Sequence, residues 1–288
     1  MSMARNRKTR KRRSKSSGLG SIFAIFGAIL ILTALIGAGA YLAINTEDEV
    51  ALDQNLCPTE GARGTIAILL DTTDELAQVT KTEIRSKILE IQSELPRFYR
   101  TSVYTLNENG LKREPLASIC NPGRLDQMDS LAREGLTANP AMIERKYSEF
   151  ENTISNAIAN VFQKKFEAAQ SPLLSSLQEL SSLLTTPVDI DDEKYTAGRN
   201  EIIFVSDFIE HTDVFSNYRT GINIDAFKNT RATEKFGRSY RDADINVLMV
   251  RRNNNGFSTL QLANFWAAVF KQEFNSDIKS LQILPGEV

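Results

Sequence analysis

The apolar residues of the chain follow two kinds of pattern. Short continuous apolar runs are typical of strands that are covered on both faces of a parallel sheet, and they occur at 64–71, 200–208 and 245–252. Apolar stripes at helical spacing occupy much of the remaining chain, at 76–95, 139–169, 173–184 and 258–274. This alternation predicts an α/β sandwich with a mostly parallel central sheet and helices on both of its faces.

Two further β-prone runs, at 102–107 and 115–120, flank the turn signal Asn109-Gly110. We therefore expect one antiparallel hairpin at an edge of the sheet. A short run at 280–285 is expected to form a last edge strand.

The N-terminal part of the chain has a different pattern. Residues 1–15 contain eight Lys and Arg and no acid, so the formal net charge of −2 leaves −10 for the rest. No charged residue occurs from Ser16 to Thr46, a stretch long enough for a hydrocarbon core of ~30 Å. Because excess Lys and Arg mark the cytoplasmic side, the pattern predicts a basic cytoplasmic tail (1–18), a transmembrane helix (19–44), a linker (45–63) and one exported domain (64–288).

A cleaved signal peptide is the alternative, because Ala38-Gly39-Ala40 resembles a small-residue cleavage site. The apolar run continues past these residues, which favours a retained single-pass anchor in contact with the lipid bilayer. The exported body lacks Asn-x-Ser/Thr sequons, which favours an inner-membrane protein with a periplasmic domain over a secretory lumen. No nucleic-acid partner is expected, since the body is acidic.

Carboxylates and hydroxyls occur where the chain leaves its buried strands. Asp71 ends the first strand and Asp207 follows the second, and ligands of open α/β sheets bind beyond the carboxyl ends of the strands. Ser171 opens a predicted helix, with Pro172 at a favoured first helical position. Such oxygens suit a hard divalent cation. The structural alternative for the acidic turn at 71–75 is that it caps the following helix.

Three motifs resemble those of von Willebrand factor A-type (vWA) domains. "LLDTTDE" (69–75) is similar to the family's strand followed by Asp-x-Ser/Thr-x-Ser, "SPLLSSL" (171–177) to its Thr-Pro-Leu-x-x-x-Leu motif, and "IIFVSDF" (202–208) to its strand ending in Ser/Thr-Asp. Their order and approximate separations fit over about 64–288. The resemblance implies a Rossmann-like vWA sandwich.

The resemblance also implies a metal-ion-dependent adhesion site. Carried over residue by residue, its members are Asp71, Thr73, Ser171 and Asp207, and the metal is usually Mg²⁺, with Mn²⁺ or Ca²⁺ as substitutes. An acidic group of a bound partner protein completes such a site. Glu75 stands where the family has its second serine, so its carboxylate either joins the metal ligands or marks a degenerate site. The glycine usual after the last Asp is also missing, and position 208 is Phe.

Cys57 and Cys120 are the only cysteines, and both lie in the exported part. An oxidising compartment favours a disulfide between them over two buried free thiols. In the vWA topology the hairpin strand that ends at Cys120 reaches the rim opposite the metal, where the first strand begins. A disulfide there would tie the linker to the domain and contribute on the order of 4 kcal/mol.

The leading functional hypothesis is a membrane-anchored module that binds another protein at the metal rim. One alternative is a metal-free structural subunit of a cell-envelope complex. The other is a phosphohydrolase of the haloacid-dehalogenase type that uses Asp71, although Thr73 stands where that signature has a second Asp. No nucleophile–base pair is assigned, so no catalytic residue is expected.

Three other polar features favour ordinary structural roles over binding. His211 is expected to be a surface-loop residue, and Arg251 with Arg252 a polar strand end. The acidic cluster at 189–193 is expected to be a solvated connection, because it lacks the glycine and the terminal Glu of a calcium-binding loop.

Overall fold

The computed structural model describes residues 18–45, 50–127, 139–164, 167–184, 198–237, 240, 243–252 and 256–285. The acidic cluster at 189–193 therefore lies outside the described residues. The chain divides into two compact units, Met1–Glu49 and Val50–Val288. The described residues of the first form the helix α1 (Gly18–Asn45). Within the described part of the chain, no helix has the length and hydropathy that a membrane-crossing segment requires.

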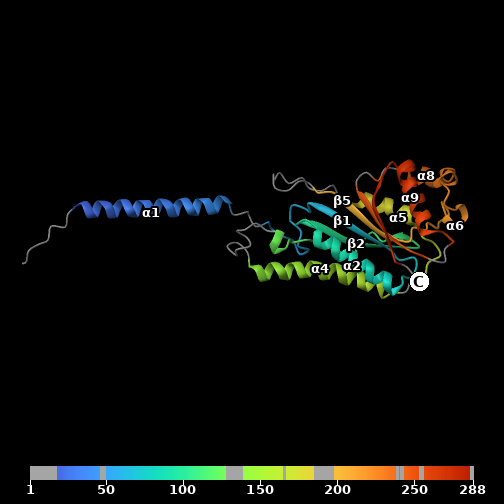
Figure 1. Cartoon of the computed structure of the whole chain (residues 1–288), viewed down its shortest axis with the longest axis horizontal. Helices are drawn as coiled ribbons and strands as arrows, with labels where there is room; N and C mark the ends of the chain where they lie inside the picture. Colours follow the sequence, from blue (N-terminus) through green and yellow to red (C-terminus); the bar gives the residue numbers. More distant parts are fainter. Residues whose placement is uncertain are drawn as a thin grey trace, which may run out of the picture. The chain divides into compact units, whose positions relative to one another are not determined.

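A seven-stranded sheet forms the centre of the second unit, in the order β3-β2-β1-β5-β6-β7 with β4 also paired to β2 (Figure 1). The neighbours among β2, β1, β5, β6 and β7 are parallel, and β3 and β4 run antiparallel to β2. The predicted mostly parallel sheet with an antiparallel edge is therefore confirmed. The strands are β1 (Gly64–Asp71), β2 (Tyr99–Asn107), β3 (Gly110–Leu111), β4 (Ala117–Cys120), β5 (Asn200–Ser206), β6 (Asp244–Val250) and β7 (Ile278–Leu284).

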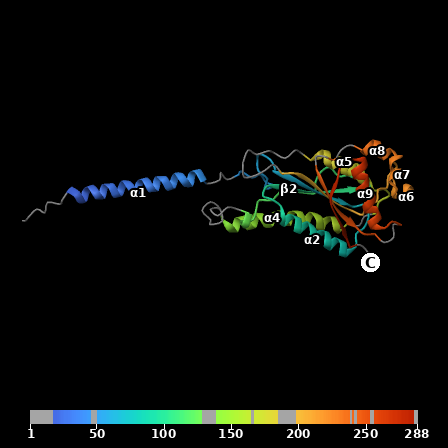
Figure 2. The same ribbon diagram turned by 45° about the horizontal axis from the view of Figure 1, so that its top comes forward.

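Helices cover both faces of this sheet (Figures 1 and 2). One face carries α2 (Gln78–Glu94) and α4 (Pro140–Phe162), and the other carries α5 (Leu173–Leu183), α7 (Ile224–Lys228), α8 (Arg231–Phe236) and α9 (Thr259–Glu273). Successive residues of β1 alternate between the two cores: Ile66, Ile68 and Leu70 pack toward α2 and α4, whereas Ala67 and Leu69 pack toward α5 and α9. This is why β1 reads as a continuous apolar run.

Several boundaries differ from the sequence prediction. The helix expected over 139–169 ends at Phe162, and the chain after it pairs with the turn that follows β1, through Asp74 and Glu167. Short elements between 217 and 236 and at 125–127 were not predicted, because three to six residues are too few to display a helical stripe. They are α6 (Asn217–Thr220), α7, α8 and the 3₁₀ turn η1 (Leu125–Gln127).

The predicted disulfide is confirmed, since Cys57 and Cys120 are bonded with their Cα atoms 4.8 Å apart. Cys120 pairs with Arg100, next to the first residue of β2, so the bridge lies at the rim where the parallel strands begin. The Cys120 amide also donates to the Asn55 carbonyl at 2.9 Å. The bridge thus fastens the segment that precedes β1 to β4.

Candidate functional site

The candidate site lies at the carboxyl ends of β1 and β5. These two strands are parallel neighbours, and Leu70 pairs with Val205, so Asp71 and Asp207 leave the sheet at the same rim. β1 and β5 lie side by side in the middle of the sheet. The strand that follows β1 in the chain, β2, lies on the other side of β1, and the strand that follows β5, β6, lies on the other side of β5. This junction is the switch point at which open α/β sheets form a crevice.

Asp71 is the centre of a hydrogen-bonded cluster. Its Oδ1 accepts from the Thr73 hydroxyl at 2.7 Å and from the Thr73 amide at 2.9 Å, and its Oδ2 accepts from the Ser206 hydroxyl at 2.7 Å. The Thr73 and Ser171 hydroxyl oxygens lie 3.2 Å apart. The turn that holds Asp71 and Thr73 is therefore brought together with Ser171, 98 residues away from Thr73. Ser206 is a further member that was not among the sequence candidates.

Ser171 is held in place by an antiparallel bridge to His211. Each of the two residues donates its amide to the other's carbonyl at 3.0 Å, and His211 Nδ1 lies 2.8 Å from the Ser216 hydroxyl. The expectation that Ser171 opens a helix with Pro172 in its first position is wrong, because α5 begins at Leu173 and Pro172 is its N-cap. His211 is half-buried. It positions Ser171 through backbone hydrogen bonds, and a backbone role of this kind cannot be predicted from the residue type.

Asp207 is almost fully buried and contacts a cationic side chain. Its Oδ1 accepts from the Ile209 amide at 3.0 Å, and its Oδ2 accepts from Arg252 Nε at 3.3 Å. Arg252 Nη1 also donates to the Glu75 carbonyl at 2.6 Å. Arg252 therefore faces the rim, and the expectation of an ordinary polar strand end is wrong for this residue. Arg251 is exposed.

The acidic turn does not cap the next helix. The N-cap of α2 is Ala77, whose side chain makes no capping hydrogen bond, so the structural alternative for 71–75 is wrong. Glu75 is exposed, and it meets Arg252 through its backbone carbonyl. Among the described residues, no group of three or more His, Cys, Asp and Glu side chains is arranged to hold a metal. A cation at this rim would therefore depend on the hydroxyls.

Burial dominates the electrostatics of the rim. It raises the pKa of Asp71 above its ordinary value, although the hydrogen bonds from Ser206 and Thr73 oppose this. Burial and the nearby Asp71 carboxylate raise the pKa of Asp207 to about 7, and Arg252 acts in the opposite direction. Asp74 also raises the pKa of Asp71. Carboxylates this close together, with little water around them, are favoured in their charged state by a nearby cation.

Phe208, which follows Asp207, has an unusual backbone conformation. Its φ is 60°, in the left-handed region that side chains rarely adopt. The Phe208 carbonyl accepts from Trp266 Nε1 at 2.6 Å, and the ring packs against Phe204 at 4.8 Å between centroids. The packed ring offsets the backbone cost that glycine would avoid.

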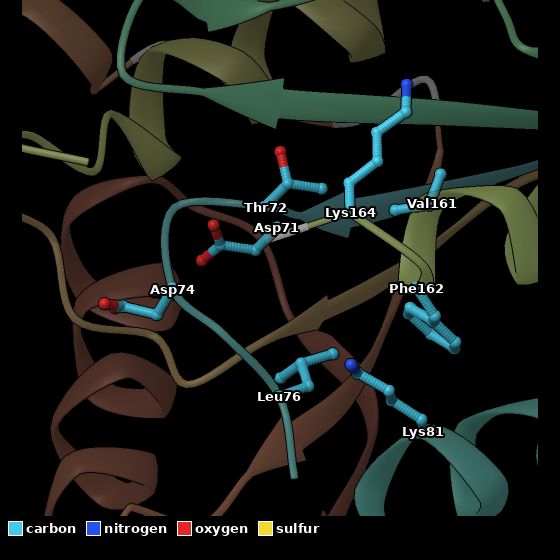
Figure 3. A pocket seen from close by; sticks show the side chains of 8 residues that line it. All are labelled: Asp71, Thr72, Asp74, Leu76, Lys81, Val161, Phe162 and Lys164. Carbon is cyan, nitrogen blue, oxygen red and sulfur yellow. The ribbon is translucent and has the colours of Figure 1, made fainter. Parts of the chain in front are cut away.

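A small pocket lies beside Asp71 (Figure 3). In this view Asp74 points outward from the turn, away from Asp71, and Lys81 and Lys164 lie on the opposite side of Asp71 from Asp74. The lining residues are Asp71, Thr72, Asp74, Leu76, Lys81, Val161, Phe162 and Lys164. The rim thus carries both acidic and basic groups within one recess.

No family model and no curated protein matches the chain. Among solved structures, one match is proximal thread matrix protein 1 from the mussel byssus, with a TM-score of 0.38 and 8% identity. The match covers 71% of this chain and 41% of that chain, so this chain spans less than half of that structure.

Proposed function

We propose that this chain is a membrane-anchored vWA-like module that binds a partner protein, through a divalent cation held at the carboxyl ends of β1 and β5. The observation that carries the proposal is that Asp71, Thr73 and Ser171 are joined by hydrogen bonds at the rim where the neighbouring strand β5 ends just before Asp207. The proposed binding function needs no catalytic residue, and we assign none.

The donor set fits a Mg²⁺-type ion. The Thr73 and Ser171 oxygens lie 3.2 Å apart, close to the roughly 3 Å that separates adjacent ligands of an octahedral ion with bonds of about 2.1 Å. The Thr73 hydroxyl donates its hydrogen bond to Asp71. The lone pairs of the Thr73 hydroxyl oxygen therefore remain available to a cation. Thr73 and Ser171 would hold the ion directly, and Asp71 and Asp207 would balance its charge.

The bound ion would supply an electrophilic position for a carboxylate of the partner protein. Lys81 and Lys164 line the adjacent pocket and would favour the same acidic partner surface. Glu75 is the one sequence candidate that we leave out of this metal shell, because its side chain is exposed and its carbonyl is engaged by Arg252.

The anchor is supported by the sequence and by the disulfide. The stretch from Ser16 to Thr46 lacks charge and follows a strongly basic tail. The Cys57–Cys120 bridge fits an oxidising compartment. We therefore propose an inner-membrane protein with a cytoplasmic N-terminus and a periplasmic or extracellular domain.

One observation favours a second function, that of a metal-free subunit of an envelope assembly. Arg252 already provides a positive charge to Asp207, so the rim is compatible with a permanent protein–protein contact that needs no ion. The phosphohydrolase alternative gains no such support, because both oxygens of its nucleophile, Asp71, accept hydrogen bonds from Thr73 and Ser206.

Calorimetric titration of the full chain in detergent with Mg²⁺, Mn²⁺ and Ca²⁺ tests the metal site. We expect saturable binding that Asp71→Ala abolishes and that Glu75→Gln, the matched exposed control, leaves within about twofold of the wild-type affinity.

Crosslinking in native membranes with and without a chelator then tests the partner. Chelator-insensitive capture of one fixed complex, together with no metal binding, would favour the metal-free subunit. Phosphate-ester turnover that Asp71→Asn removes would overturn the binding-module proposal.

A further inference from the structure

Each carboxylate oxygen of Asp71 and Asp207 has a partner from the protein itself. Asp71 is satisfied by Thr73 and Ser206, and Asp207 Oδ1 is satisfied by the Ile209 amide. All of these partners are neutral and come from the same two strand ends. Only Asp207 Oδ2 accepts from a charged group, Arg252, which comes from the end of β6.

The Arg252 contact is partly shielded from water and is the longest of the set. The side chains of Arg252 and Asp207 are 18% and 7% exposed, so solvent screens their charges little. The Nε–Oδ2 distance of 3.3 Å exceeds the 2.7–2.9 Å typical of charge-assisted hydrogen bonds. The Arg252 contact therefore favours the charged form of Asp207 without fixing the carboxylate tightly.

A divalent ion and a guanidinium group cannot both lie against Asp207 without strong repulsion. At close range in a partly buried site, like charges disfavour each other by an amount that outweighs one long hydrogen bond. We propose that Arg252 is a resident cation that competes with the divalent ion for Asp207, so that the rim alternates between an Arg252-closed state and a metal-loaded state.

The competition links the metal to two loops. Arg252 Nη1 also holds the Glu75 carbonyl, so the side chain joins the segment after β6 to the turn after β1. When the ion displaces Arg252, both contacts are released together. Metal occupancy therefore changes the surface around residue 75 in addition to filling the rim.

The inference rests on the proposed cation site, and its test separates the two. Mg²⁺ affinity is measured by calorimetry on the full chain in detergent for the wild type, Arg252→Gln, Arg251→Gln and Asp71→Ala. Arg251 is the matched control, because it is the adjacent arginine and is exposed. We expect Arg252→Gln to raise the Mg²⁺ affinity by about tenfold or more, because a like charge is removed from beside the ion. Arg251→Gln is expected to change it less than twofold.

A second measurement uses the wild-type chain and does not depend on the folding of a variant. In ¹H–¹⁵N spectra of arginine side chains, the Arg252 Nε–H is expected to exchange slowly without metal and to lose that protection on Mg²⁺ saturation. Wild-type binding that Asp71→Ala removes, with equal affinity in Arg252→Gln or an unchanged Nε–H signal, overturns the role of Arg252 and keeps the cation site. Absence of Mg²⁺ binding in every variant overturns both.

Discussion

At the residue scale, Glu210 shows how the loop after β5 supports the site. The first turn of α5 follows Pro172, whose side chain cannot cap it, and Glu210 takes over this task from the other side of the rim. Its Oε2 accepts from the Leu174 amide at 2.9 Å, and its Oε1 accepts from the Thr212 hydroxyl at 2.9 Å. A buried carboxylate thus fixes the start of the helix that carries the Ser171 motif.

Glu210 also makes the stability of the fold depend on pH. Burial raises the pKa of Glu210 to about 7 from its ordinary 4.5. Between these two values the folded chain keeps a proton that the unfolded chain has lost, so the free energy of unfolding falls as pH rises through this window. Asp207, with a pKa of about 7, acts in the same direction.

Glu210→Gln is expected to keep the bond to Leu174 and to remove this buried charge. The decrease in the free energy of unfolding between pH 4.5 and 7.5 is then smaller, by on the order of 2 kcal/mol. Urea unfolding across this pH range measures the slope, with the exposed Glu75→Gln as the control. A slope identical to that of the wild type would contradict the assignment of Glu210.

Phe208 gives a second prediction at this scale. Phe208→Ala and Phe208→Gly both remove the buried ring, at a cost of about 3 kcal/mol. Because φ at this position is 60°, the Gly variant is expected to be more stable than the Ala variant by about 1 kcal/mol. This order is the reverse of the usual one. Chemical denaturation of the two variants measures it, and a more stable Ala variant would show that the left-handed backbone is not retained.

At the element scale, the long apolar runs could be predicted from sequence, and the site partners could not. The continuous run of β1 and the stripe of α2 are local patterns, so they identify their elements directly. The positions of Asp71 and Asp207 followed from the rule that parallel strands end at one rim. His211 and Arg252 were missed as site residues because their roles arise from contacts between segments that the sequence pattern does not relate. Ser206 stands in the third motif, but the motif did not indicate that its hydroxyl bonds to Asp71.

The disulfide belongs to this scale because it joins the segment before β1 to β4. It closes a loop between residues 63 positions apart, and replacing both cysteines by serine is expected to lower the free energy of unfolding by about 4 kcal/mol. Urea unfolding of the double variant against the oxidised wild type measures this. The reduced wild type should approach the double variant, and a reduced chain as stable as the oxidised one would show that the bridge adds no constraint.

At the scale of the whole molecule, all residues of the candidate site belong to one of the two units. Val50–Val288 contains the sheet, both cores, the disulfide and the rim, whereas Met1–Glu49 contributes one helix. Because the site lies entirely within the second unit, the cation chemistry proposed for it does not require the first. The proposed anchor would instead decide where the rim is displayed.

The topology of the anchor is the last prediction, and it follows from charge asymmetry. Eight Lys and Arg precede the uncharged stretch, and Glu47, Asp48 and Glu49 follow it, so the positive-inside rule places residues 50–288 outside the cytoplasm. Protease added to intact spheroplasts is expected to digest this unit, and protease added to inverted membrane vesicles is expected to leave it intact until detergent is added. Replacing the eight basic residues by Ser or Gln should reduce the fraction in this orientation. Full protection in spheroplasts would contradict the predicted orientation, and release by alkaline carbonate would indicate that residues 19–44 are not retained as an anchor.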